Sequence, residues 1–141
     1  MRCMSSLGSA RDRLRLTTLS RALLPSLVVL TLSLALTNVE NVDFLMHFLG
    51  GVAIAWGMVI IVKDKKPSLS TWLRNYLAFS TTAVIGILWE FHEWVEDYYF
   101  LTSRQPDLTD TMNDLLMDLL GAVFIILVLD LSRRYKQAKK A

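Results

Sequence analysis

The sequence contains a single cysteine, Cys3, among its 141 residues. One thiol excludes an internal disulfide and a metal site built from cysteines. The chain also lacks an HExxH motif, a nucleophile motif and a phosphate-binding loop, and it has no internal repeat or low-complexity tract. These short motifs would each carry a defined mechanism. No common catalytic motif therefore supports an enzymatic function.

Apolar residues are abundant, at 53% of the chain, and the mean hydropathy is +0.40. A soluble domain of this size is less apolar. Three segments are long enough to cross a hydrocarbon core of about 30 Å, namely residues 22–38, 44–62 and 112–131. A fourth segment, residues 76–89, is shorter, but tryptophan and tyrosine flank it as in interfacial belts. We therefore predict an all-α, polytopic membrane protein with a bundle of four transmembrane helices.

The basic residues predict the orientation, because lysine and arginine in short flanking segments resist translocation. Every basic residue except Arg104 precedes the first segment, joins the second to the third or follows the fourth. We therefore expect both termini to be cytoplasmic. The predicted organisation is a basic N-terminal segment at residues 1–21, a transmembrane domain at 22–131 and a basic tail at 132–141. Basic tails beside a membrane are typical of topology anchors, so no nucleic-acid partner is expected.

The first segment also has features of a signal peptide, with Ala35-Leu36-Thr37 as a poor cleavage site. Its apolar run is longer than the roughly 7 to 15 residues usual in such signals, which favours an uncleaved helix. A mitochondrial presequence is a further alternative, because the segment is rich in arginine and poor in acids.

Acidic residues are distributed in the opposite way from the basic ones, because ten of the 13 lie in the outer loops and the outer halves of the predicted helices. These ten are Glu40, Asp43, Glu90, Glu93, Glu96, Asp97, Asp107, Asp110, Asp114 and Asp118. An ionisable side chain at membrane depth costs roughly 2.5 to 3.5 kcal/mol on insertion scales. Several of these together therefore require partners, water or a bound cation.

Helical periodicity places many of these acids on shared faces. At about 100° per residue, three helices each present a polar end above small residues. The faces are Asp43, His47, Gly50, Ile54 and Gly57; Ala83, Gly86, Glu90, Glu93 and Asp97; and Asp110, Asp114, Asp118 and Gly121. Small residues allow close helix packing, so we expect the three faces to turn inward together near the outer membrane face.

Several of these residues also have simpler interpretations. Asp107 or Thr109 is placed to cap the fourth helix, and Asp110 in the first turn suits the helix dipole. A solvated helix extension would account for Glu93, Glu96 and Asp97, and a packing role would account for His47. Asp130 lies close to Arg133 and Arg134 in the sequence, which favours an interfacial ion pair.

Three motifs follow one another on successive helices. They are Asp43-x-x-x-His47-Phe48-x-x-Gly51, Glu90-x-x-Glu93-Trp94, and Asp107-x-x-Asp110-Thr111-x-x-Asp114 followed by Gly121-Ala122. With them the chain resembles the YjdF-type family of small bacterial membrane proteins, which is distantly similar to VanZ-like proteins. The family pattern has tryptophan where this chain has Thr109, and it does not include Asp118. The resemblance implies a multi-pass protein of the bacterial inner membrane but supplies no reaction.

The residues themselves indicate a class of chemistry. One imidazole with several carboxylates suits a divalent metal ion such as Mg²⁺, Mn²⁺, Ca²⁺, Zn²⁺ or Fe²⁺. The predicted ligands are His47, Glu90, Asp110 and Asp114, with Glu93 as general base. The predicted supporting residues are Asp43, Asp118, Gly51 and Gly121. Such a site suits a metal-dependent hydrolase or transferase acting on an envelope lipid or a lipid-linked substrate.

A non-enzymatic function is the alternative: a cation-binding, ligand-binding, transport-accessory or structural membrane protein. Burial raises carboxylate pKa values, so protonated acids bonded between helices would need no metal. Transport through one monomer is disfavoured, because residues 52–62 and 122–129 contain no ionisable side chain. A transport route would therefore require a homo-oligomer or a partner besides the lipid bilayer.

Overall fold

The computed structural model describes residues 3–36 and 42–140, with side chains from Leu16 onward. Every regular element in these ranges is a helix, which confirms the all-α prediction. The helices are α1 (Cys3–Ala35), α2 (Asp43–Lys65), α3 (Thr71–Phe100) and α4 (Leu108–Ala138). Arg2 and Glu40 lie outside the described residues, as do the side chains of Arg11, Arg13 and Arg15.

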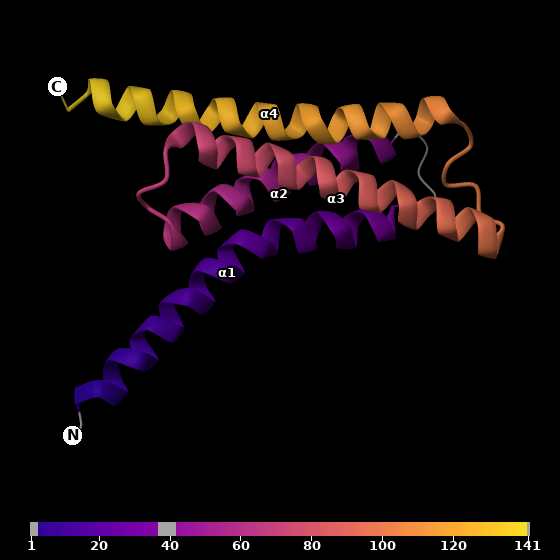
Figure 1. Ribbon diagram of the computed structural model, residues 1–141. Helices are drawn as coiled ribbons and strands as arrows, with labels where there is room; N and C mark the ends of the chain where they lie inside the picture. The colour runs from indigo at the N-terminus through magenta and orange to yellow at the C-terminus, as the bar shows by residue number, and fades with distance from the viewer. Residues whose placement is uncertain (1–2, 37–41, 141) are drawn as a thin grey trace.

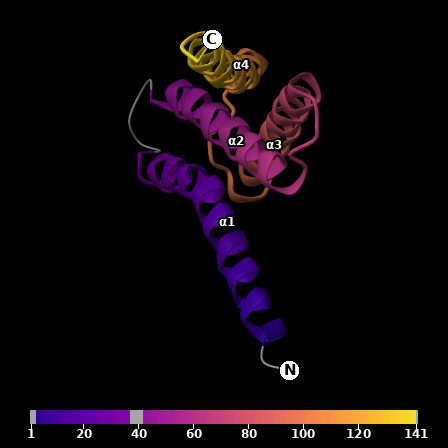
Figure 2. The ribbon, with the colours of Figure 1, turned by 90° about the vertical axis from the view of Figure 1, so that its left-hand side faces the viewer.

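The helices run in alternating directions around a central α2 (Figure 1). Helix α2 contacts α1, α3 and α4, and α3 also contacts α4 (Figure 2). Within the described residues, α1 contacts α2 alone. The start of α1, the loop between α2 and α3, and the end of α4 therefore lie toward one end of the bundle, and the loop between α3 and α4 lies at the other.

Helix α1 begins at Cys3, well before the predicted start of the first span at Ala22. Its apolar part is Leu16–Ala35. Residues 3–21 contain no proline, and proline is the residue that most strongly opposes helix formation. Pro25 lies inside α1, and the helix is bent (Figure 1). A proline removes one helical hydrogen bond and kinks the helix. The predicted boundary after residue 21 is thus not a boundary in secondary structure.

Helix α3 is much longer than its predicted apolar segment. Ser70 begins it, because its side chain accepts a hydrogen bond from the Leu73 backbone N–H. The helix extends to Phe100 through a charged final third. By length and composition, three of the described helices can cross a membrane, with candidate spans at Leu16–Ala35, Asp43–Lys65 and Leu108–Ala138. Helix α3 is not among them, so the structure supports three candidate spans within four helices.

The interior of the bundle is built from small side chains, while large apolar side chains lie outside. Ala55, Val59, Ala78 and Ala122 form the buried core. Large exposed apolar residues occur on every helix; examples are Leu24, Phe44, Leu88, Phe91 and Leu127. Soluble monomers rarely expose such contiguous apolar surface. This inverted distribution is that of a chain whose surroundings are lipid.

Two glycines allow α2 and α4 to approach closely. A Cβ on Gly51 would overlap the backbone carbonyl of Asp118, and a Cβ on Gly121 would overlap the carbonyl of Phe48. The close packing of α2 against α4 therefore depends on the absence of side chains at both positions. These are the two glycines that the sequence predicted to support the site. Gly51 lies one helical turn from the predicted ligand His47 on α2, and Gly121 lies two turns from Asp114 on α4.

Candidate functional site

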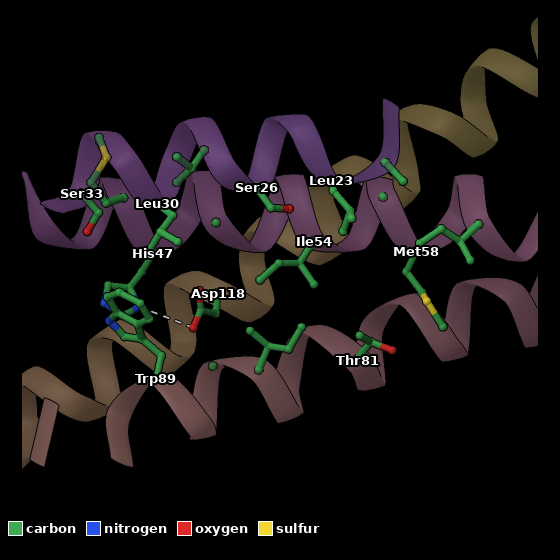
Figure 3. Close-up of a pocket in the computed structure, with 18 residues that line it drawn as sticks. Leu23, Ser26, Leu30, Ser33, His47, Ile54, Met58, Thr81, Trp89 and Asp118 are labelled. Carbon is green, nitrogen blue, oxygen red and sulfur yellow. Dashed lines mark hydrogen bonds and ion pairs between the residues drawn. The ribbon is translucent and has the colours of Figure 1, made fainter. Parts of the chain in front are cut away.

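His47 is the centre of a buried polar cluster formed by α2, α3 and α4. Its Nδ1 lies 3.4 Å from Oδ2 of Asp118, within hydrogen-bond distance, and 4.0 Å from Oε1 of Glu90. Its Nε2 lies 3.8 Å from Oδ2 of Asp114 and 4.0 Å from Oδ1 of Asp43. Figure 3 shows His47 joined to Asp118. Both imidazole nitrogens thus face carboxylates, so the predicted inward orientation of these faces is confirmed for these residues.

Helix α3 contributes two buried carboxylates, each of which has one oxygen bonded. The amide Nε2 of Gln105 donates to Oε2 of Glu90 at 2.7 Å. The indole Nε1 of Trp89 donates to Oε1 of Glu93 at 3.0 Å. The remaining oxygens, Oε1 of Glu90 and Oε2 of Glu93, have no hydrogen-bond partner in the described structure. Glu93 is only 2% exposed, so it does not belong to a solvated helix extension.

Helix α4 contributes Asp114 and Asp118 to the interior and Asp110 to the outer edge of the cluster. Asp114 is 3% exposed, and its Oδ2 has no hydrogen-bond partner among the described residues. Asp107 begins the helix, because its Oδ1 accepts hydrogen bonds from the backbone N–H groups of Thr109 and Asp110. These two bonds lower the pKa of Asp107, and they confirm its predicted capping role.

The ligand atoms lie close enough together to surround a cation. Three sets each place their ligand atoms within 4.8 Å of one another: Asp43, His47 and Glu93; His47, Glu90 and Asp114; and Asp43, Asp110 and Asp114. Imidazole nitrogen and carboxylate oxygen are ligands for divalent metal ions. Leaving a buried carboxylate oxygen unpaired is costly. The unpaired oxygens of Glu90, Glu93 and Asp114 therefore fit a site for a positively charged ligand.

Asp97 and Glu96 bind the loop after α3 and take no part in the cluster. The carboxylate of Asp97 accepts hydrogen bonds from the Thr102 hydroxyl and from the backbone N–H groups of Arg104 and Gln105. These bonds, that from Thr102 foremost, lower the pKa of Asp97. Glu96 forms an ion pair with Arg104. The predicted shared face therefore ends at Glu93.

Two further charged residues lie outside the cluster. The side chain of His92 is 53% exposed, and its Nε2 lies 3.6 Å from Oε1 of Glu96. Asp130, near the other end of α4, accepts a hydrogen bond from Nη1 of Arg133 at 3.0 Å. Asn75 donates to its second oxygen at 2.8 Å. The predicted ion pair of Asp130 is therefore confirmed for Arg133.

The sequence did not predict the contacts that Gln105, Arg104 and Trp89 make with the cluster. Gln105 holds Glu90, and Nη1 of Arg104 lies 4.0 Å from Oε1 of Glu93. Both belong to a loop without periodicity, so no pattern indicated their positions. Trp89 precedes Glu93 by four residues, and this spacing places both on one helix face. This spacing could therefore have indicated the contact between Trp89 and Glu93 from the sequence.

Comparison with known proteins identifies a family. Residues 11–135 match the family described as "Predicted membrane protein (DUF2238)". No curated protein and no solved structure matches the chain. The YjdF-type proteins belong to this family, which confirms that part of the resemblance, whereas the relationship to VanZ-like proteins stays a prediction. Since the match covers most of the chain, the protein belongs to the DUF2238 family of predicted membrane proteins.

Proposed function

We propose that this membrane protein binds a divalent cation between α2, α3 and α4, with ligands from His47, Glu90, Asp110 and Asp114. One observation carries the proposal: His47, Glu90 and Asp114 come from three helices, are all buried, and place ligand atoms within 4.8 Å of one another. Two of these ligand residues also have a buried oxygen without a hydrogen-bond partner. A cation supplies the missing partner and balances the buried negative charge.

Asp118 is the positioning residue in this proposal. Its Oδ2 lies 3.4 Å from Nδ1 of His47. A histidine that donates one ring N–H to a carboxylate presents its other nitrogen to a metal. In His47 that nitrogen is Nε2, which faces Asp114 and Asp43. Asp118 thus fixes the imidazole, and Asp43 adds a carboxylate at the outer side.

The proposed activity is metal-dependent hydrolysis or group transfer on a lipid or lipid-linked substrate. A divalent cation, when bound, activates water or polarises a phosphoryl oxygen. Glu93 is the proposed general base, because it shares a set of close ligand atoms with His47 and Asp43. The Trp89 indole fixes one of its oxygens and leaves Oε2 unpaired to accept a proton.

We propose that all four helices cross the bacterial inner membrane, with residues 22–131 as the transmembrane domain. Helix α3 supports this because it packs along both α2 and α4, which are candidate spans. The lysines and arginines at the end of α2, the start of α3 and the end of α4 lie at one end of the bundle. Arg104 lies at the cluster end. This asymmetry supports cytoplasmic termini and a cluster at the outer face.

Elemental analysis of purified protein tests the cation site. We expect a stoichiometric divalent metal in the wild type and its loss in His47→Ala and Asp114→Asn. The matched controls are His92→Ala and Asp130→Asn, which change the same residue types outside the cluster. Both controls should retain the metal. A folded wild-type protein without metal, after growth and purification with added divalent ions, would refute the proposal.

Hydrogen-bond donors within the protein favour a second candidate function, in which the cluster is structural and its carboxylates are protonated. Gln105 and Trp89 each satisfy one oxygen of a buried glutamate without any metal. The same samples decide between the two functions. If the wild type contains no metal and Asp114→Asn is as stable as the wild type, the buried acids are protonated, because an amide imitates a neutral carboxyl group.

A further inference from the structure

An apolar groove lies between α1, α2 and α3 and leads to the cluster. Its volume is about 350 Å³. Helix α1 contributes Leu23 and Leu30, and α2 contributes Ile54 and Met58 (Figure 3). Helix α3 contributes Ile85. Within the described residues α1 does not contact α3. The groove therefore faces the surroundings of the bundle along the gap between these two helices.

The groove is polar at one end and mostly apolar elsewhere. His47, Trp89 and Asp118 line the end next to the cluster (Figure 3). Along α2 the lining continues from His47 to Ile61, a length of about 21 Å at 1.5 Å per residue. The hydroxyls of Ser26, Ser33 and Thr81 are the other polar groups of the lining, and hydroxyls in helices bond readily to their own backbone.

We propose that the groove binds one acyl chain of a membrane glycerophospholipid, whose phosphate headgroup then lies at the His47 end. The inference rests on the proposed function, because it names the substrate class of the same cation site. Three features support this occupant. The groove is open toward lipid, its length is a large part of a hydrocarbon core of about 30 Å, and its single charged end adjoins the cluster.

Charge determines how the headgroup is held. Asp118 lies at the polar end of the groove, and Asp114 and Glu90 surround His47 just beyond it. Carboxylates alone repel a phosphate group, whereas a cation between them attracts it. The proposed arrangement therefore places the apolar chain along Ile54 and Ile85 and the phosphate beside the cation. The acyl chain provides most of the apolar contact, and the cation determines where the headgroup stops.

Two isoleucines of α3 provide a matched test of the groove. Ile85 lines the groove and is 40% exposed, whereas Ile87 is 47% exposed and does not line it. Purified protein in detergent is titrated with dioleoylphosphatidylglycerol, and bound lipid is read by native mass spectrometry. We expect a single lipid adduct on the wild type and on Ile87→Trp. Ile85→Trp, which fills the groove, should bind the lipid about tenfold more weakly or worse.

A second pair on α1 keeps the test valid if Ile85→Trp does not fold. Leu30 lines the groove, and Leu32, of similar exposure, does not. Leu30→Trp should lose the adduct, and Leu32→Trp should keep it. If the two variants within each pair bind the lipid equally, the inference is overturned. A wild-type dimer that dissociates in Ile85→Trp or Leu30→Trp would also overturn it, because a second copy of the chain would then cover the groove.

Metal analysis of the same samples separates this inference from the proposed function. Ile85→Trp leaves every proposed ligand in place, so it should retain the cation while losing the lipid. If both isoleucine variants retain the metal and bind the lipid equally, the acyl-chain groove is rejected and the cation site is retained. A metal-free wild type that still shows the groove-dependent adduct rejects the cation site and keeps the acyl-chain groove.

Discussion

The adjacent glycines Gly50 and Gly51 allow a sharp test of how α2 and α4 hold the cluster. Both lie in the interior of α2, but they face different surroundings. A Cβ added at Gly51 would overlap the backbone of Asp118. A Cβ added at Gly50 would lie 3.8 Å from Oδ1 of the same residue, an ordinary contact. Alanine should therefore be tolerated at Gly50 and should force α2 and α4 apart at Gly51.

The magnitude follows from comparing the two variants with each other. Replacing glycine by alanine within a helix stabilises it by about 0.5 to 1 kcal/mol, and this contribution is common to both. It cancels in the comparison and leaves the cost of overpacking, which is about 1 to 3 kcal/mol. Backbone atoms of Asp118 are the obstacle, so no rotamer change relieves the overlap. Gly51→Ala should be less stable than Gly50→Ala by about 1 to 3 kcal/mol.

Equilibrium unfolding in mixed micelles measures this difference. Purified variants are titrated with a denaturing detergent, and tryptophan fluorescence reports the transition. Gly50→Ala should be as stable as the wild type or slightly more stable. Gly51→Ala should unfold at lower denaturant and, because Asp114 moves with α4, should also lose metal. Equal stability of the two variants would refute the close backbone approach between α2 and α4.

Two further predictions concern the topology and the loop after α3. A periplasmic alkaline phosphatase reporter fused after Arg104 should be active and one fused after Lys66 inactive, and the reverse pattern would overturn the proposed orientation. At neutral pH the free energy of unfolding of Asp97→Asn should be lower than that of the wild type by about 1 kcal/mol or less, because this carboxylate is exposed to solvent. Because folding lowers the pKa of Asp97, the wild-type advantage should be complete above the ordinary value of 3.8 and should decline as the pH falls below it. Thermal unfolding from pH 3 to 7 checks this, with Asp64→Asn as an exposed control; a difference between wild type and Asp97→Asn that does not change with pH would contradict it.

The helical arrangement was predictable because each helix is long and has a simple pattern. The apolar segments near residues 44–62 and 112–131 correspond to most of α2 and to the centre of α4. The start of α1 was not predictable from hydropathy, because residues 3–21 are mostly polar or charged. Helix α3 was located, and its predicted polar face already extended the helix to Asp97, three residues before its end at Phe100.

The candidate site was predictable to the extent that it depends on helix faces. Asp43 and His47 lie one turn apart, so their common direction follows from the 3.6-residue period. The sequence could not decide whether Glu93 was solvated, because burial of its face depends on how closely α3 packs against α2 and α4. Gln105 was beyond prediction, since it reaches Glu90 from a loop. Sequence patterns thus identify which side chains share a face, and tertiary packing determines which of them meet.

The glycine contacts between α2 and α4 separate the framework of the cluster from its chemistry. Main-chain atoms lie in close contact at Gly51 and Gly121, and these contacts involve neither the charge of Asp114 nor that of His47. A rigid framework discriminates among cations by size, because a cage that cannot adjust fits one ionic radius better than another. The ligands can then be exchanged one at a time, aspartate for asparagine or histidine for glutamine, while the frame keeps its dimensions. In the proposed cation site, the frame would therefore set the size of the cage and the ligand types would set its preference among cations of similar size.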